Sequence, residues 1–445
     1  MKPAYKKPFI LTLSSLGIAG VVCAFIVWEI HSDNLTVPQQ SLAGVSALLF
    51  ILVGIRTVVK WADDWSAGEA LTVCRQSFSW KLFFTLVFWD ILVLFLAWPL
   101  RCVLLEPMTL GQSMERWVCG DGVHYWHIAR DWYLSSGSID RVVQLVFLPG
   151  YPLLIRLFHL LIPNWTYAAL TVSGLCFALA GTVLYSLLRM EYTTETARRA
   201  VKILCILPGS FFFSAPMSES LFLLCCVCCF YFARTNRWIL AGIAGAGAAF
   251  TRSLGITLMV PMVLELVHAH IRSSQTRPKW FDWLSVLIVP LGFGAYLLVN
   301  LQVSGNAFQF LTYQAEHWHQ KLGFFFHTAS YQTEYAMGTW QSDPHNFWGL
   351  WIPNLVASIS ALCVMVWGAG KLRASENVWF LPYYGIAIGA TWLLSAPRYL
   401  VAFFPLATVI SLACEKRWTR IVMISTISAL SVLYYLAFLL RWQVY

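Results

Sequence analysis

The chain has 445 residues, of which 59% are hydrophobic and 11% are charged, and its mean hydropathy is +0.66. Soluble domains carry roughly 25% charged residues, so this composition excludes a soluble globular protein and indicates one large helical membrane domain. We expect the formal net charge of +9 to reflect the lysine and arginine excess on the inner side of membrane proteins. No nucleic-acid partner is expected.

Apolar runs of about 20 residues predict membrane-spanning helices, because lipid offers no partner to free backbone groups and no strand-like alternation is visible. The first run, Phe9–Trp28, is too long for a signal peptide and lacks a small-x-small cleavage site, so we expect a retained helix. We predict an all-α polytopic membrane protein with about 13 transmembrane helices, near residues 9–28, 42–60, 82–100, 167–188, 200–214, 217–234, 238–251, 255–271, 283–301, 348–370, 378–394, 399–414 and 419–440.

The apolar run 145–162 is interrupted by Pro149, Gly150 and Pro152, which predicts a broken, half-immersed helix on the outer side. With a cytoplasmic N-terminus, 21 of the 30 lysines and arginines lie on the inner side, as the positive-inside rule requires. Counting 145–162 as a full span would move the basic residues of 189–202 outside, which the same rule disfavours.

The predicted topology, with the N-terminus inside and the 13 spans above, leaves two long loops on the outer side, 101–144 and 302–347, and places the C-terminus there as well. It also predicts an N-terminal two-helix extension, 1–81, before a main transmembrane domain, 82–445. Within the second loop, the aromatic-rich stretch 305–323 favours an amphipathic helix that lies on the membrane surface.

Most of the 12 cysteines lie inside apolar runs such as Leu224–Tyr231, and we expect small buried hydrophobic side chains there instead of metal ligands. Cys102 and Cys119 flank the first half of the outer loop 101–144. The sequence leaves both a disulfide and free thiols open for this pair.

A carboxylate and an imidazole lie close together in the first outer loop, in the stretch "CGDGVHYWHIARDWY". Asp121 stands between two glycines, which let the backbone bend and approach a substrate, and His124 is near enough to share its site. The alternative is a turn carboxylate with a neighbouring aromatic cap.

Three more charged residues interrupt apolar sequence where burial would be costly: Glu219 in "PGSFFFSAPMSESLF", Arg252 in "FTRSLG" and Arg398 in "SAPRYL". Glu219 could lie in the first turn of a capped helix or point into a cavity at the membrane edge. The arginines could extend toward lipid headgroups or bind phosphate, for which the guanidinium geometry is well suited.

Six stretches, in order over about residues 82–440, resemble motifs of the PIG-V family, the GPI mannosyltransferase II type of the GT-C glycosyltransferase superfamily. They read "GDGVHYWHIA", "FLPGYP", "PGSFFFSAPMSESLF", "TRSLG", "GNAFQF" and "RYLVAFFP". The chain departs from the family at Gly120, Met217 and Leu254, where the motifs have tryptophan, tyrosine and asparagine, and these departures leave the acceptor open.

The resemblance implies a GT-C-like catalytic domain over 82–445. It would transfer mannose, or a related hexose, from a polyprenyl-phosphate sugar donor to an acceptor hydroxyl with inversion. Carried over by position, Asp121 is the acidic catalytic residue of the first outer loop, and His124, Glu219 and Arg252 match motif residues. We expect these three and Arg398 to bind the donor or substrate, with His124 and Glu219 orienting the sugar or the acceptor. We expect the two arginines to hold the donor phosphate. No metal or other cofactor is required, although a divalent metal is compatible with the chemistry.

The expected partners are therefore the lipid-linked sugar, a glycolipid, polysaccharide or protein acceptor, and the bilayer. The active site would be extracytoplasmic, at a bacterial plasma membrane or in the endoplasmic reticulum. Two alternatives remain at this point: a transporter or flippase of lipid-linked sugars, and a non-catalytic membrane scaffold.

Overall fold

The computed structural model describes residues 3–32, 34–66, 77–133, 143–272 and 277–444. The described chain is helical throughout, apart from one isolated bridge between Leu322 and Ala390, and this confirms the all-α prediction. Within the described residues, eight helices are long and apolar enough to cross a membrane. They are α1 (Pro3–Ile30), α2 (Val37–Ser66), α3 (Trp80–Leu104), α8 (Trp165–Leu188), η3–α12 (Ser253–Arg272), η4–α13 (Trp280–Ser304), α16–η5–α17 (Pro344–Gly368) and α21 (Arg417–Leu439).

The other five predicted spans lie on shorter helices, so that these five also cross the membrane stays a prediction. These helices are α9 (Thr194–Ile206), α10 (Glu219–Arg234), α11 (Trp238–Thr251), α18 (Ala374–Ile388) and the pair α19 (Ala396–Val401) and α20 (Pro405–Ala413). Even α10, with 16 residues, extends only about 24 Å, less than the roughly 30 Å hydrocarbon core. Such helices are tolerated at membrane depth because other helices surround them.

Breaks between these short helices occur at prolines and glycines. Between α9 and α10 the chain passes Pro208, Gly209 and Pro216, and Gly209 adopts a left-handed conformation with φ +90°. Pro405 starts α20 and separates it from α19. Each break exposes backbone groups that a single continuous helix would pair internally, and the break after α9 leads directly to Glu219.

The predicted broken helix at 145–162 is found as a single turn, Gln144–Val146, followed by α7 (Gly150–His159). The outer-loop segments also form helices: α4 (Leu110–Glu115), α5 (Asp121–Asp131), α14 (Gln309–His317) and α15 (Phe325–Thr339). α14 lies within the stretch predicted to rest on the membrane surface, and its Phe310 is buried in a cluster with Leu148 and Tyr296. Cys102 and Cys119 are free thiols.

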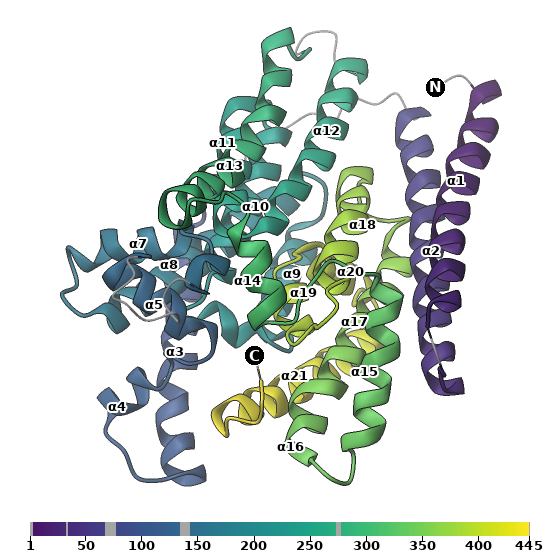
Figure 1. Ribbon diagram of the computed structural model, residues 1–445. Coiled ribbons are helices and arrows are strands. Elements are labelled where there is room, and N and C mark those ends of the chain that lie inside the picture. The colour runs from purple at the N-terminus through teal and green to yellow at the C-terminus, as the bar shows by residue number, and fades with distance from the viewer. Residues whose placement is uncertain (1–2, 33, 67–76, 134–142, 273–276, 445) are drawn as a thin grey trace.

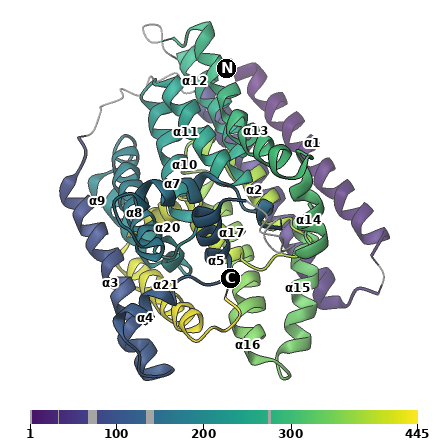
Figure 2. The same cartoon turned by 60° about the vertical axis from the view of Figure 1, so that its left-hand side comes forward.

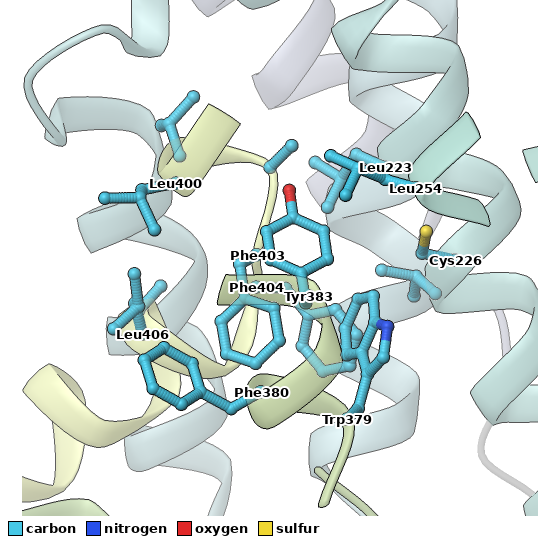
Figure 3. Close-up of a cluster of buried hydrophobic side chains, with 14 of the residues drawn as sticks. Leu223, Cys226, Leu254, Trp379, Phe380, Tyr383, Leu400, Phe403, Phe404 and Leu406 are labelled. Carbon is cyan, nitrogen blue, oxygen red and sulfur yellow. The ribbon is translucent and has the colours of Figure 1, made fainter. Parts of the chain in front are cut away.

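Helices α8, α10, α18 and α20 contribute residues to the largest buried hydrophobic cluster, and α10 lies between α8 and α18 in Figure 1. Figure 2 shows α8 and α20 overlapping when the molecule is turned. A cluster of buried aromatic rings fixes α19 against α18 (Figure 3): Phe403 lies 4.7 Å from Trp379 and 5.0 Å from Tyr383, centroid to centroid. The Tyr383 hydroxyl also donates to the backbone oxygen of Tyr399, at 2.6 Å. This packing holds the segment that carries Arg398.

The first two helices lie together at one side of the bundle, and α2 packs against α15, α17 and α18 (Figure 1). Polar contacts join this pair to α15. The Trp28 Nε1–H donates to His327 Nδ1 at 2.9 Å, and the Gln39 side-chain amide donates to Glu334 at 3.0 Å. The boundary of the predicted extension at residue 81 stays a prediction.

A buried charge cluster that the sequence did not indicate lies at the C-terminal end of α10. Arg234 contacts Glu191 at 3.1 Å, Glu265 at 3.5 Å and Glu376 at 2.7 Å, and Arg373 also pairs with Glu191 and Glu265. These ion pairs connect α10, α12, the turn after α8 and the start of α18. Because the carboxylates are paired, their burial is tolerated, and the cluster joins four parts of the chain at one end of the bundle.

Candidate active site

Asp121 occupies the first position of α5, where a carboxylate interacts favourably with the positive end of the helix. The preceding residue, Gly120, has φ +52°, a conformation that glycine adopts without steric cost. At Gly122 an added Cβ would lie 3.1 Å from the backbone oxygen of Pro216. The glycines therefore let the first turn of α5 approach the segment between α9 and α10.

Four of the predicted site residues form one continuous chain of ion pairs. Arg398 binds Asp121 through Nη2, at 2.6 Å from Oδ2, and binds Glu219 Oε1 through Nε. Arg252 binds the same Glu219 oxygen through Nη1. The order of contacts is thus Asp121, Arg398, Glu219, Arg252, drawn from α5, α19, the first turn of α10 and the end of α11.

The four ion-paired side chains differ in how much of their surface is exposed to solvent. The Glu219 side chain is fully buried and that of Arg398 is 3% exposed, whereas the Asp121 side chain is 30% exposed. Glu219 Oε2 has no hydrogen-bond partner among the described residues. Of the four ion-paired residues, Asp121 is therefore the one that a molecule arriving from solvent contacts first. Glu219 binds both arginines on their buried side.

Neutral side chains complete the site around the two guanidinium groups. The Ser218 hydroxyl accepts from Arg252 at 3.3 Å and lies 3.0 Å from the Tyr125 hydroxyl. The Tyr399 ring contacts both arginines, with its centroid 4.8 Å from the Arg252 guanidinium carbon and 5.8 Å from that of Arg398. Such cation–π contacts orient the guanidinium groups and leave their remaining N–H groups free to donate.

His124 follows Asp121 by one helical turn but takes no part in the chain of ion pairs. Its ring stacks on Phe147 at 4.6 Å between centroids and meets the edge of Trp318 at 6.2 Å. Burial lowers the pKa of His124 below its ordinary value, and the nearby Asp121 carboxylate offsets this only in part. The imidazole is therefore neutral at pH 7 and presents one donor and one acceptor.

Opposing effects set the protonation of Asp121. Burial alone would raise its pKa, but the charge and hydrogen bond of Arg398, together with His124 and Arg252, outweigh burial and hold the pKa below its ordinary value. Burial raises the pKa of Tyr125 to about 12. At neutral pH the site therefore contains an ionised Asp121 and a protonated Tyr125.

The sequence thus placed Asp121, His124, Glu219, Arg252 and Arg398 in one site, and the structure brings them together; their individual roles stay predictions. The alternative that the two arginines extend to lipid headgroups is wrong, since both bind Glu219. Ser218 precedes α10 but its side chain caps no backbone group. Sequence reasoning missed the neutral partners Tyr125, Ser218 and Tyr399, whose only signal was their position directly beside a charged site residue.

Comparisons with known proteins bear on part of this site. Residues 148–295 match the family model described as dolichyl-phosphate-mannose-protein mannosyltransferase, a segment that contains Glu219 and Arg252. Among solved structures, the chain is similar to ArnT from Cupriavidus metallidurans bound to undecaprenyl phosphate, with 13% sequence identity and a TM-score of 0.46 over 81% of this chain and 75% of that chain. No curated protein matches the chain.

Proposed function

We propose that this protein is a membrane glycosyltransferase of the GT-C type that moves mannose, or a related hexose, from a polyprenyl-phosphate donor to an acceptor hydroxyl. The chain of contacts from Asp121 through Arg398 and Glu219 to Arg252 carries the proposal. These contacts place a partly exposed carboxylate near two fixed guanidinium groups at the ends of apolar helices. The phosphate of a membrane lipid also lies where apolar surroundings meet water, so its charge could reach these groups.

The family match supports the donor class. Its description names dolichyl phosphate mannose, and the matched segment supplies Glu219 and one of the two arginines. Arginine binds phosphate through two parallel N–H···O contacts, which fixes orientation as well as charge. The PIG-V resemblance, and with it mannose itself, stays a prediction.

The proposed reaction is an inverting displacement. The acceptor oxygen attacks the anomeric carbon, its proton passes to the Asp121 carboxylate, and the bond between the anomeric carbon and the phosphate oxygen breaks on the opposite face. The electron pair leaves with the lipid phosphate, whose charge Arg398 and Arg252 stabilise. His124, neutral at pH 7, is placed to hydrogen-bond the sugar or the acceptor.

Arg398 couples the two halves of this reaction. Its Nη2 donates to Asp121, and a phosphate oxygen is a competing acceptor for the same N–H group. Binding of the donor phosphate to Arg398 would weaken the ion pair between Arg398 and Asp121, and this would raise the proton affinity of the Asp121 carboxylate. The base would therefore become effective when the donor is in place.

The active site is extracytoplasmic in this proposal, because the threading that satisfies the positive-inside rule puts α5 on the outer side. The acceptor would be part of a glycolipid, a polysaccharide or a protein that reaches the membrane surface. No metal takes part in the proposed steps.

Replacing Asp121 by Asn tests the function directly. Transfer by the purified full-length protein from radiolabelled polyprenyl-phosphate mannose should fall by about 10²–10⁴-fold, the usual contribution of a general base. Asp131→Asn, at the other end of the same helix, is the matched control and should retain activity. Near-normal transfer by Asp121→Asn would remove Asp121 from the mechanism, and lipid movement without mannose release by the wild type would favour a flippase.

A further inference from the structure

A polar cavity of about 420 Å³ is lined by residues that precede Asp121 in the chain and by Arg441, and the proposed reaction has not used it. It is formed between the α3–α4 connection, α4 and the end of α21. Its polar lining consists of Glu106, Gln112, Glu115, Arg116 and Arg441. The volume falls within the range of small-molecule binding sites, roughly 300–1,000 Å³.

The cavity lies near Asp121 along the chain. Val118 lines the cavity and stands three residues before Asp121, so their Cα atoms are at most about 11 Å apart. The start of this segment is held against α21, because the ring of Trp117, directly before Val118, lies 5.6 Å from that of Phe438. Gly120, between cavity and carboxylate, is exposed. A molecule in the cavity could therefore present an atom to Asp121 from solvent.

The charges of the lining indicate which chemistry it would accept. Glu106 pairs with Arg116, and the second carboxylate, Glu115, and the second guanidinium, Arg441, form no ion pair among the described residues. Two acids and two bases give the lining no net charge. An anion could bind only the two guanidinium groups, whereas sugar hydroxyls can donate to the carboxylates and accept from the guanidinium groups, so a neutral saccharide can use the whole polar lining.

The backbone at Arg441 is held in an uncommon conformation. Arg441 has φ +59°, in the left-handed region that non-glycine residues rarely adopt. The next residue fixes it: the Trp442 N–H donates to Ala437 O at 2.9 Å, its ring stacks 5.0 Å from His345, and its carbonyl lies so near Gly349 that a Cβ there would be 2.0 Å away. The Arg441 N–H also donates to Phe438 O, at 3.1 Å, so this left-handed residue is the Schellman-type end of α21, and it fixes where the Arg441 side chain leaves the helix.

We propose that this cavity binds the acceptor, and that the acceptor group is a neutral saccharide with its attacking hydroxyl directed toward Asp121. This inference rests on the proposed glycosyl transfer and narrows the acceptor from any hydroxyl compound to a carbohydrate without phosphate or carboxylate groups at the binding site. Glu115 and Arg441 are the principal binding residues, because their charges are not used by each other or by another ion pair within the described chain.

The test measures binding of neutral disaccharides to the full-length protein in lipid nanodiscs by saturation-transfer NMR. The probes are maltose, cellobiose, chitobiose and mannobiose, with maltose 1-phosphate as the anionic comparison. At least one neutral probe should bind, and the double variant Glu115→Gln/Arg441→Gln should bind it about tenfold more weakly, as expected when charged hydrogen-bond partners are lost. Glu316→Gln/Arg156→Gln changes the same two residue types at exposed positions outside the cavity and should bind normally.

The proposal is overturned if no neutral disaccharide binds, if both double variants bind alike, or if maltose 1-phosphate binds more tightly than maltose. A separate assay of mannose release from the lipid donor distinguishes this failure from failure of the proposed function. Release of mannose without disaccharide binding would overturn the inference alone. Binding that the Glu115→Gln/Arg441→Gln variant loses, with no mannose release from any donor, would overturn the glycosyltransferase and leave a sugar-binding cavity.

Discussion

Glu219 joins the two arginines of the site through a single carboxylate oxygen, and its own side chain is fully buried. Two guanidinium groups this close repel each other unless an anion lies between them. Of the four linked residues, Glu219 is therefore the one on which the arrangement of the others depends, although it is the farthest from solvent.

We expect Glu219→Gln to lower the free energy of unfolding by about 3–5 kcal/mol, the usual cost of leaving buried charges uncompensated. Thermal unfolding of the purified protein in detergent measures the change, with the exposed Glu316→Gln as control. Adding Arg252→Gln to Glu219→Gln should recover part of the loss, since the repulsion is removed. Strictly additive effects of the two substitutions would show that the pair is not coupled.

His124 provides a pH-dependent signal from the same site. Its pKa in the folded protein is lowered by burial, so the unfolded chain binds the proton first. The stability contributed by neutral His124 is present above the ordinary histidine pKa, near 6.5, and is lost as the pH falls through the lower folded-state value.

Replacing His124 by Phe keeps an aromatic ring against Phe147 and removes the titrating group. Between pH 7.5 and pH 5 the wild-type melting temperature should fall further than that of His124→Phe. Melting curves of both proteins at the two pH values measure the difference. An equal fall in both would mean that His124 does not resist protonation.

The charged members of the site were predictable from sequence because charge is costly in apolar surroundings. Asp121, Glu219, Arg252 and Arg398 each interrupt apolar or aromatic sequence, and the motif order linked them. Tyr125 and Tyr399 carry no such signal in a chain with 18 tyrosines. Their part in the site depends on which helices become neighbours, and a single sequence does not contain that information.

At the scale of helices, hydropathy located every predicted span on a helix, and eight of these spans lie on described helices that are long enough to cross a membrane. A hydropathy window reports apolar length and does not distinguish lipid contact from protein contact. The apolar run 399–414 is a pair of short helices inside the bundle, and 200–214 ends in a turn before Pro216. Both runs are apolar because protein covers them.

The cluster at Arg234 was missed for a related reason. Its basic residues, Arg234 and Arg373, are two of the 21 that the predicted topology places on the inner side, and no role was predicted for its glutamates. Positive-inside counting treats each charge as solvated. In the structure Arg234, Glu265 and Glu376 are buried, Arg373 and Glu191 are partly buried, and the five are paired across four parts of the chain, so they stabilise tertiary packing.

Close contact between α11 and α13 gives a sharp test at the element scale. At Gly292 in α13 an added Cβ would lie 1.9 Å from the backbone oxygen of Ala246, whereas at Gly294 in the same helix nothing lies within 4 Å. Small residues allow membrane helices to approach in this way. Gly292→Ala must displace a backbone and should destabilise the protein by about 1–3 kcal/mol.

Gly294→Ala is the matched control, because it makes the same chemical change two residues away. It should be neutral, or stabilising by about 0.5–1 kcal/mol through the higher helix propensity of alanine. Thermal unfolding of both variants in detergent measures the contrast. Equal stability of the two variants would contradict the close approach of α11 and α13.

At the scale of the whole molecule, the two charge clusters lie at opposite ends of α10. Glu219 begins the helix and Arg234 ends it, which separates them by about 22 Å along the axis. The cluster at Glu219 includes the partly exposed Asp121, whereas in the cluster at Arg234 the two arginines pair with three glutamates and no side chain is exposed. This asymmetry gives the bundle one end suited to chemistry and one suited to structural support.

Which end faces the cytoplasm is the premise on which the extracytoplasmic reaction rests. The threading predicts that Asn306, between α13 and α14, lies outside with Asp121, and that Lys416, before α21, lies inside. Both side chains are exposed. A membrane-impermeant maleimide should therefore label Asn306→Cys in intact cells and Lys416→Cys only after permeabilisation, with the unsubstituted protein as the measure of background from its 12 cysteines. The opposite pattern would put Asp121 on the cytoplasmic face, where the donor phosphate and acceptor would have to arrive from the inner leaflet.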